Sequence, residues 1–281
     1  MNYLKTLKFG SNKLKLNNID SYILDSEILL SFALKLSREQ ILINLNHNIN
    51  KNSFIKFKKL LTRREKREPI AYIIKKKEFW KNNFYVNNDV LIPRPETELI
   101  VEEVLKNIKN TSSRSLLEIG TGSGCIIISV IKERLNCKAT AIDVCKKALN
   151  IAKFNAKIHH LRNKVNFINI NIDKIRDNKY DFIISNPPYI KKFDLKRLDG
   201  SVRLFEPHIA LDGGIDGLRE IKKIIIKSKK LLKRNGKLIF EIGNYQSNIT
   251  QKILIENGYY INKVIKDNSS IPRVIVSTKI I

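Results

Sequence analysis

The residues best suited to chemistry in this sequence are Asn186, Pro187, Pro188 and Tyr189, which directly follow an apolar run at residues 180–185. Proline has no amide hydrogen and a fixed φ, so two prolines in succession stiffen the chain and end a strand. They also bias Asn186 and Pro187 toward extended backbone shapes. We therefore expect the chain to leave its sheet at Asn186 with carbonyl groups directed into a cleft.

This corner offers a pair of hydrogen-bond acceptors. The side-chain oxygen of Asn186 and the carbonyl oxygen of Pro187 match the two N–H donors of a planar NH2 group. Tyr189 can pack flat against the group that carries this nitrogen, and its ring face favours a cationic transition state. Asn186, Pro187 and Tyr189 are therefore the predicted catalytic residues, and Pro188 joins them in the predicted substrate site. A rigid turn with a polar cap is the alternative interpretation.

Catalysis at such a site would depend mostly on alignment, which alone can supply effective molarities of ~10⁵–10⁸ M. No strong base is needed before a group is transferred to the nitrogen, because the nitrogen can lose its proton afterwards. This agrees with the absence of His and Cys from the stretch at residues 184–190.

A glycine-rich loop follows a second apolar run, at residues 115–119. Glycine stands at every second position of this loop, which consists of Gly120, Thr121, Gly122, Ser123 and Gly124. Glycine lets a backbone turn tightly and approach a ligand without a Cβ in the way. In an open α/β sheet such a loop lies at the carboxyl edge of the strands, where ligands bind.

The spacing of these glycines distinguishes between classes of cofactor. Dinucleotide-binding loops have the pattern G-x-G-x-x-G, which places a pyrophosphate on a helix N-terminus. Here Cys125 occupies the last position of that pattern, and an acid, Glu118, precedes the loop. The arrangement resembles the first motif of S-adenosylmethionine-dependent methyltransferases, in which the loop wraps the amino-acid end of the cofactor.

Asp143 lies near the end of a third apolar run, about 20 residues beyond the loop. A carboxylate at this position can accept hydrogen bonds from both ribose hydroxyls of a cofactor. The contact would serve NAD and S-adenosylmethionine equally well. Asp143 therefore predicts a ribose-bearing cofactor without choosing between the two.

These sites must be positioned by a sheet, and the pattern from residue 94 onward predicts one. Strand-like runs occupy residues 115–119, 138–144, 165–170, 180–185, 236–242, 259–266 and 273–280. Helical stretches separate most of them, which predicts mainly parallel strands with helices on both faces. The last two runs are joined too closely for a helix, so we expect an antiparallel hairpin at one edge. The predicted fold class is α/β, with a seven-stranded Rossmann-like sheet.

Two smaller regions precede this domain of residues 94–281. Residues 1–75 have helical periodicity and predict a small helical domain, in which Ser37 and Gln40 are spaced as a capping box. Residues 76–93 predict a β-hairpin linker. The long irregular stretch at residues 191–214 is expected to close over the substrate.

The chain has 53 Lys and Arg residues against 27 acids, a net charge of +26. This charge permits acidic partners such as nucleic acid, but lysines spread along a chain rich in Ile and Asn fit a biased base composition as well. Three cysteines, with no C-x-x-C pair and no metal-ligand spacing, predict neither disulfides nor a metal site. No signal-peptide core and no apolar run of membrane-spanning length is present, so we expect a cytoplasmic protein that does not associate with a membrane.

Further motifs stand in a fixed order along nearly the whole chain. They are REPIAY (67–72), EFW (78–80), LIPRPETE (91–98), EIGTGSG (118–124), SNPPYI (185–190) and FEPHIALDGGIDGL (205–218). In this set the chain resembles the release factor glutamine methyltransferase family, also called HemK or PrmC. N-P-P-Y alone is shared with adenine-amino methyltransferases, whereas the first, third and last motifs are far more specific.

The resemblance implies a substrate, a cofactor and a set of site residues. The substrate would be the side-chain amide nitrogen of the glutamine in the Gly-Gly-Gln tripeptide of class-one peptide chain release factors, gripped in part by the helical domain. The cofactor would be S-adenosyl-L-methionine, held by residues 120–124, Asp143 and Asn186, and the glutamine would be held by residues 186–189. Nucleic acid would not be required.

The chain departs from the family pattern after the third predicted strand, where an acid and an aromatic residue commonly lie near the adenine. By register, Asn171 and Ile172 occupy these places, with Asp173 just beyond. Ile172 is therefore predicted to cover the adenine by apolar contact.

Three other functions stay open at this stage. An adenine-amino DNA or RNA methyltransferase is favoured by the positive charge, but base chemistry in duplex DNA requires base flipping and a recognition surface. A non-catalytic binding module with a decayed cofactor site is opposed by the intact glycine loop, Asp143 and N-P-P-Y. A nicotinamide oxidoreductase is disfavoured by the glycine spacing.

Overall fold

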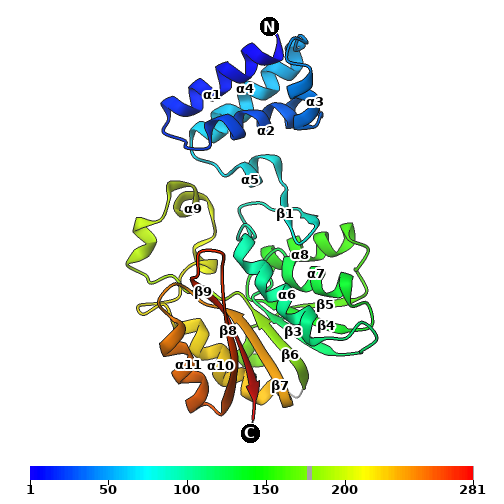
Figure 1. Ribbon diagram of the computed structural model, residues 1–281, viewed down its shortest axis with the longest axis vertical. Helices are drawn as coiled ribbons and strands as arrows, with labels where there is room; N and C mark the ends of the chain where they lie inside the picture. The colour runs from blue at the N-terminus through cyan, green and yellow to red at the C-terminus, as the bar shows by residue number, and fades with distance from the viewer. Residues whose placement is uncertain (176–178, 281) are drawn as a thin grey trace. The chain divides into compact units, whose positions relative to one another are not determined.

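The computed structural model describes residues 1–175 and 179–280, and they fall into two compact units. Unit 1 comprises Met1–Lys76 and Asp199–Phe205, and unit 2 comprises Lys77–Leu198 and Glu206–Ile281. Figure 1 labels the helices and strands of each unit. Within the described residues, every helix is too short or too polar to cross a membrane.

Unit 1 is built from helices. They are α1 (Tyr3–Leu16), α2 (Tyr22–Leu34), α3 (Arg38–Ile43), α4 (Lys51–Glu65), α5 (Ile70–Ile74) and α9 (Gly200–Phe205). Leu14, Leu29 and Phe57 are fully buried in a core shared by α1, α2 and α4. The predicted capping box at α3 is confirmed, because Ser37 Oγ accepts the Gln40 N–H at 3.2 Å and Gln40 Oε1 accepts the Ser37 N–H at 2.8 Å.

Unit 2 contains a seven-stranded sheet in the order β5-β4-β3-β6-β7-β9-β8. Its strands are β3 (Ser115–Ile119), β4 (Lys138–Asp143), β5 (Val165–Asn169), β6 (Tyr180–Ser185), β7 (Leu232–Glu241), β8 (Tyr259–Lys266) and β9 (Pro272–Lys279). The first five are parallel to one another, whereas β9 runs antiparallel to both β7 and β8. The predicted α/β fold class, with its antiparallel edge hairpin, is confirmed.

Helices cover both faces of this sheet (Figure 1). On one side are α6 (Glu98–Asn107), α7 (Cys125–Glu133) and α8 (Lys146–Ile158), and on the other are α10 (Arg219–Leu231) and α11 (Ser247–Glu256). The side chains of a strand alternate between the faces. In β6, Phe182 and Ile184 therefore join one buried cluster while Ile183 joins the other.

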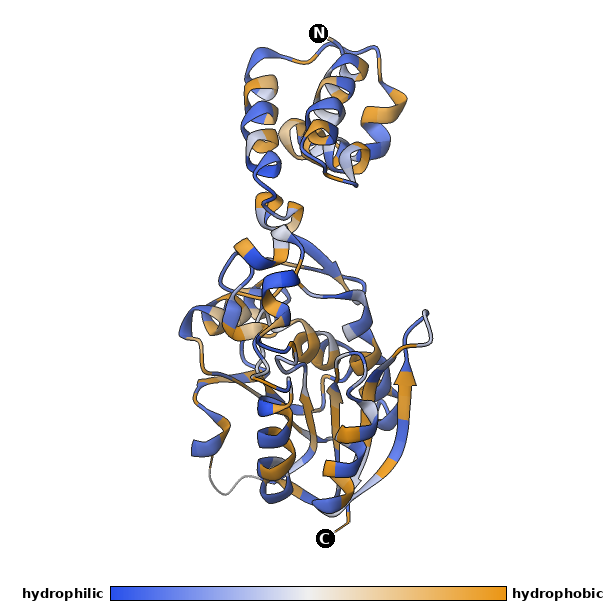
Figure 2. Ribbon diagram, turned by 90° about the vertical axis from the view of Figure 1, so that its left-hand side faces the viewer, coloured by the Kyte–Doolittle hydropathy of each residue, from blue (hydrophilic) through white to orange (hydrophobic). Residues whose placement is uncertain are grey.

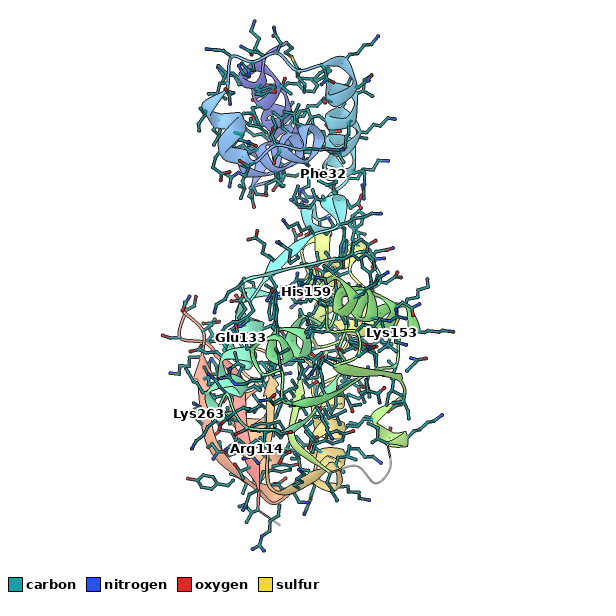
Figure 3. The ribbon with its side chains drawn as sticks, turned by 90° about the vertical axis from the view of Figure 1, so that its right-hand side faces the viewer. Phe32, Arg114, Glu133, Lys153, His159 and Lys263 are labelled. Atoms are coloured by element: carbon teal, nitrogen blue, oxygen red, sulfur yellow. The ribbon has the colours of Figure 1, made fainter. Side chains whose placement is uncertain are left out.

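Hydropathy follows this layering. Figure 2 shows apolar residues concentrated in the central strands and polar residues on the outer surface. Arg114, Glu133 and Lys153 are exposed and project outward from unit 2 (Figure 3). An apolar layer thus buries each face of the sheet. The carboxyl ends of the parallel strands form the edge at which a ligand can bind.

A two-stranded hairpin precedes the sheet, with β1 (Lys77–Phe79) and β2 (Asn82–Phe84) paired antiparallel. The predicted hairpin is present, and Asn82 and Asn83 lie in its second strand. The turn is formed by Trp80 and Lys81, both with positive φ. The Trp80 N–H is held by Glu98 Oε1 at 2.8 Å, a contact from α6 that local sequence could not reveal.

Candidate active site

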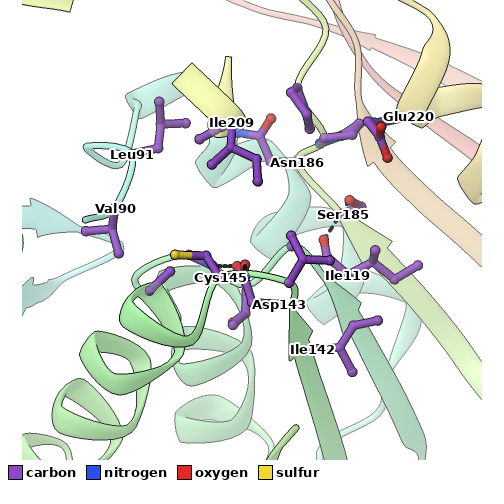
Figure 4. A pocket seen from close by; sticks show the side chains of 18 of the residues that line it. Val90, Leu91, Ile119, Ile142, Asp143, Cys145, Ser185, Asn186, Ile209 and Glu220 are labelled. Carbon is purple, nitrogen blue, oxygen red and sulfur yellow. Dashed lines mark hydrogen bonds between the residues drawn. The ribbon is translucent and has the colours of Figure 1, made fainter. Parts of the chain in front are cut away.

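A cavity of about 430 Å³ opens in unit 2 at the carboxyl ends of β3, β4 and β6. This volume lies within the range of ~300–1,000 Å³ typical of small-molecule sites. The cavity is lined by the glycine loop, the end of β4, residues 185–188, residues 89–91 and a segment around Ile209. Figure 4 shows Asp143 and Cys145 on one side of it and Asn186 and Ile209 on another.

Gly120 and Gly122 give the loop its shape. Their φ angles are +71° and +55°, a region that side-chain-bearing residues adopt at a cost. The N–H groups of Gly120 and Thr121 both donate to the carbonyl of Ile142, at 2.9 and 3.0 Å, which ties the loop to β4. A Cβ built on either glycine would meet only open space, so these two backbones face the cavity.

Gly124 has a different role from the other two loop glycines. It begins α7 with φ +79°, and a Cβ there would lie 2.8 Å from Ile128 Cδ1 and 3.2 Å from Ala152 Cβ. Its small size therefore allows α7 and α8 to pack closely. Of the five loop residues predicted to bind cofactor, Gly120, Thr121, Gly122 and Ser123 line the cavity. Gly124 does not line it and instead packs against Ile128 and Ala152.

Asn155 on α8 supports the same loop and was missed by sequence reasoning. Its side chain is fully buried, and Nδ2 donates to the carbonyl of Ser123 at 2.8 Å. The same amide also bonds the backbone of Tyr85, through Nδ2 at 3.0 Å and Oδ1 at 2.8 Å. A lone Asn within a helical pattern gives no signal of such a role.

Asp143 lies at the end of β4 and lines the cavity, as predicted. Its Oδ2 accepts the Gly122 N–H at 2.9 Å, and its Oδ1 accepts the Cys145 N–H at 2.8 Å. Partial burial raises the pKa of this carboxyl, and the backbone donors act in the opposite direction. Each oxygen retains a further lone pair with which to accept a ligand hydroxyl.

The residues present fit S-adenosyl-L-methionine. The two glycines leave a cradle that side chains would fill, and Asp143 offers acceptors at its rim. Ile142, Ile172 and Ile224 give the same cavity an apolar wall, and Ile172 is 5% exposed. The cavity thus combines polar acceptors for a ribose with an apolar surface for a flat base.

Glu118 lies beneath the loop as a buried acid in β3. Its Oε2 accepts a hydrogen bond from the Thr121 hydroxyl, while no partner of its Oε1 is found in the described part of the chain. Burial raises the pKa of Glu118 to about 8, against the lowering effect of the Thr121 hydroxyl. This acid is thus protonated over most of the neutral pH range.

Asn186 follows β6, directly beside the glycine loop, because β6 is the parallel neighbour of β3. Asn186, Pro187 and Pro188 all line the cavity. The Asn186 amide nitrogen donates to Thr97 Oγ1 at 3.0 Å. The structure therefore brings the predicted acceptor corner and the predicted cofactor loop to one cavity.

Tyr189 is placed differently from the prediction. Its hydroxyl donates to Glu241 Oε1 at 3.0 Å, and its ring packs against the apolar cluster beneath β7. Burial raises the pKa of the hydroxyl. Tyr189 is not among the residues that line the cavity. Its hydroxyl is held by Glu241, next to the acceptor corner.

Two glycines pack closely against the N-P-P-Y corner. A Cβ on Gly213 would lie 2.8 Å from Tyr189 Cα, and one on Gly217 would lie 2.7 Å from Gln246 Nε2. Gln246 Nε2 donates to the carbonyls of Tyr189 and Gly217, each at 3.1 Å. This close packing explains two of the three glycines in the motif at residues 205–218, Gly213 and Gly217.

An ion pair joins two of the specific motifs. Arg94 Nη2 contacts Glu206 Oε1 at 2.5 Å, and Glu206 Oε2 accepts the Ile92 N–H at 3.1 Å. Glu206 is almost fully buried, and Arg94 lines the cavity. This pair anchors the segment that carries Pro207 and Ile209, which line the cavity within the stretch expected to close over it.

Two aromatic side chains near the hairpin, those of Trp80 and His159, have packing roles. Trp80 packs against the apolar cluster under the hairpin. His159 packs against the Phe84 ring at a centroid distance of 4.9 Å, with Nε2 2.9 Å from the Asn83 carbonyl. Within the described residues, no group of three or more His, Cys, Asp or Glu is arranged to hold a metal ion.

Comparisons with known proteins agree with this arrangement. A model described as the PrmC N-terminal domain matches residues 5–74, and one described as the methyltransferase small domain matches residues 96–200. A crystal structure of a methyltransferase from Pyrococcus furiosus has a TM-score of 0.53 and 21% identity, and the match covers 70% of this chain and 89% of that one. This likeness establishes the fold alone.

Curated relatives are closer. A bifunctional methyltransferase of Rickettsia felis is 36% identical, over 98% of this chain and 58% of its own length. A release factor glutamine methyltransferase of Buchnera aphidicola subsp. Baizongia pistaciae is 41% identical, over 97% of this chain and 98% of its own length. The chain therefore belongs to the release factor glutamine methyltransferase family, which confirms the resemblance seen in its motifs.

Proposed function

We propose that this chain methylates the side-chain amide nitrogen of the glutamine in the Gly-Gly-Gln motif of class-one peptide chain release factors. The observation that carries the proposal is the orientation of Asn186. Its amide nitrogen is committed to Thr97, so its oxygen lies on the other side of the amide, in a residue that lines the cavity. An amide substrate needs acceptors of this kind.

The family supports the same substrate. The Buchnera relative is named for release factor glutamine methylation and matches this chain over nearly its full length. The acceptor corner is also selective for an NH2 group, because the Pro187 carbonyl can only accept hydrogen bonds. Both N–H groups of a glutamine amide would be satisfied by Asn186 and Pro187.

The chain's own residues would hold and align this amide. Asn186 and Pro187 fix the plane of the NH2 group, so that one face of the nitrogen points toward the glycine loop. Pro188 stiffens the corner, and Tyr189 supports it from below through Glu241. Alignment of this kind can supply effective molarities of ~10⁵–10⁸ M. The proton on the nitrogen would leave to water after the methyl group has passed from the cofactor sulfur to the nitrogen.

S-adenosyl-L-methionine, when bound, supplies an electrophilic methyl group carried on a positively charged sulfur. We assign its binding to Gly120, Thr121, Gly122, Ser123, Asp143 and Ile172, with Asn186 at the boundary between cofactor and substrate. Gly124 would support this set through the packing of α7. Asp143 would accept the ribose hydroxyls, and Ile172 would cover the adenine.

We assign a role to each part of the chain, as the sequence predicts. Residues 1–75 would help to dock the release factor, residues 76–93 would link the two parts, and residues 94–281 would carry the chemistry. Nucleic acid would not be required. Peptide release takes place in the cytoplasm, and we infer that the chain acts there.

The proposal is tested by transfer of a radiolabelled methyl group. A class-one release factor should be labelled, and the same factor with its Gly-Gly-Gln glutamine replaced by alanine should not. DNA and RNA serve as parallel acceptors, because N-P-P-Y and the charge of +26 also fit an adenine-amino methyltransferase. Label in nucleic acid, with none in the release factor, would overturn the proposal in favour of that second function.

A further inference from the structure

Four side chains form a continuous chain of hydrogen bonds beneath the acceptor corner. Asn186 Nδ2 donates to Thr97 Oγ1 at 3.0 Å, and the Thr97 hydroxyl donates to Glu241 Oε2 at 2.6 Å. The hydroxyl of Tyr189 donates to the other oxygen, Glu241 Oε1, at 3.0 Å. Both ends of the N-P-P-Y corner are therefore tied to one carboxylate at the end of β7.

The polarity of this chain follows from the chemistry of its members. The two oxygens of Glu241 each accept a hydroxyl, one from Thr97 and one from Tyr189, so the single hydroxyl hydrogen of Thr97 points to Glu241. Thr97 can then only accept from Asn186, which requires the NH2 group and not the oxygen of the Asn186 amide to face it. Glu241 thus determines which end of the Asn186 amide is turned toward Thr97.

Burial makes this constraint strict. Thr97 and Glu241 are each 2% exposed, so water cannot replace either partner. Burial raises the pKa of Glu241 and Glu96 adds to this effect, whereas the Thr97 and Tyr189 hydroxyls and Arg273 on β9 favour the ionised form. Arg273 also forms an ion pair with Asp267 at 2.7 Å. The positive charge of Arg94 lowers the pKa of the Tyr189 hydroxyl, against the larger raising effect of burial.

We propose that Thr97 and Glu241 are positioning residues that make the site selective for glutamine over glutamate. They do so by keeping the oxygen of Asn186, and not its nitrogen, available to the substrate. This inference rests on the proposed function. With the Asn186 amide flipped, its NH2 group would face the NH2 group of a glutamine, and two donors cannot pair. The flipped amide would instead suit a carboxylate.

The test compares two release factors, one with Gly-Gly-Gln and one with that glutamine replaced by glutamate. The measured quantity is the ratio between the inhibition constant of the glutamate form and the KM of the glutamine form. Thr97→Val removes the hydroxyl at nearly constant volume, and Glu241→Gln allows either polarity. Both variants should lower this ratio by roughly tenfold or more. In them the Asn186 amide can flip, which removes the mismatch between its oxygen and the carboxylate of the glutamate form.

Matched variants separate this effect from damage to the fold. Thr97→Ser keeps the hydroxyl and should keep the ratio of the native chain. Thr250→Val alters another fully buried threonine of unit 2, one whose hydroxyl has no partner in the described residues, and should leave the ratio unchanged. Glu103→Gln replaces another buried glutamate, on α6, and controls in the same way for Glu241→Gln. Thr250→Val and Glu103→Gln should also keep the cofactor affinity of the native chain.

A measurement without substrate distinguishes failure of this inference from failure of the proposed function. Nitrogen-15 NMR can follow exchange of the Asn186 side-chain amide protons with water, with Asn186→Asp to assign the signal. Exchange should be slow in the native chain and in Thr250→Val, and faster in Thr97→Val. Equal exchange rates in native and Thr97→Val chains would overturn the inference, as would an unchanged ratio between the two release factors. An unmethylated release factor would overturn the proposed function, while the exchange measurement would still decide the role of Thr97.

Discussion

Oδ2 of Asp143 accepts the backbone N–H of Gly122 across 2.9 Å. The residue assigned to the ribose of the cofactor therefore also holds the glycine loop assigned to its amino-acid end. Its other oxygen accepts the Cys145 N–H at 2.8 Å, at the start of α8. One carboxylate thus couples two strands and a helix at the rim of the cavity.

This coupling predicts the effect of Asp143→Asn. An asparagine has one acceptor oxygen, so its NH2 group would face the N–H of either Gly122 or Cys145, and a donor would be left unpaired. An unpaired buried group costs about 1–3 kcal/mol. Calorimetry should show S-adenosyl-L-methionine affinity weakened by roughly 10- to 100-fold. Asp20→Asn, an exposed change in unit 1, is the control, and equal affinity in the two variants would contradict the assignment.

Gly122→Ala should block the cofactor without unfolding the chain. The added Cβ would meet no protein atom within 4 Å, so it would occupy space assigned to the ligand. The positive φ of +55° adds a strain of about 1 kcal/mol. Gly258→Ala, at φ +79° near the end of α11, is a matched control for this strain. Urea unfolding should show similar losses of stability in both variants, and calorimetry should show lost cofactor binding in Gly122→Ala alone.

Asn186→Ala should separate binding from turnover. The variant loses one acceptor at the reacting nitrogen, which can cost ~10²–10³ in rate. The glycine loop and Asp143 are untouched, so cofactor affinity should stay largely intact. Steady-state kinetics and calorimetry on the same preparation check this. Weakened cofactor binding with normal turnover would be the opposite result and would remove Asn186 from the substrate site.

The buried acid Glu118 predicts the pH dependence of stability. Its pKa in the folded chain is about 8, above its ordinary value of 4.5, so the folded chain binds more protons than the unfolded chain between these values. Stability should therefore be greatest near the lower value and fall as pH rises toward about 8, by up to roughly 4–5 kcal/mol. Burial also raises the pKa of Asp143, which acts in the same direction.

Glu118→Gln should flatten most of this dependence, because the amide has no proton to lose. Urea unfolding at several pH values in the native chain, Glu118→Gln and the exposed control Glu256→Gln measures the slope. The control should follow the native chain. A native slope that persists in Glu118→Gln would show that another group carries it.

The sheet could be predicted because its information is local. Apolar strands with helices between them predict a mainly parallel sheet, and parallel strands share a carboxyl edge. The sequence therefore predicts that Asn186 lies beside the glycine loop. The strand at residues 180–185 has the bounds that the sequence predicts, and β7 begins only a few residues earlier than expected.

The support beneath the site could not be predicted, because it is non-local. Thr97 and Glu241 are 144 positions apart, and their contact depends on how β7 and the turn before α6 meet. The position of the Tyr189 ring depends on the same carboxylate. One signal was present in the sequence: Glu118 and Glu241 each directly follow apolar residues within a strand, and burial of an acid requires a partner.

The most direct test of the central claim is peptide mass spectrometry of a class-one release factor after incubation with this chain and S-adenosyl-L-methionine. We expect a single added methyl group on the glutamine of the Gly-Gly-Gln tripeptide, and none when the Asn186→Ala variant replaces the native chain. An unmodified glutamine after incubation with active native chain, or a methyl group on another residue, would contradict the account.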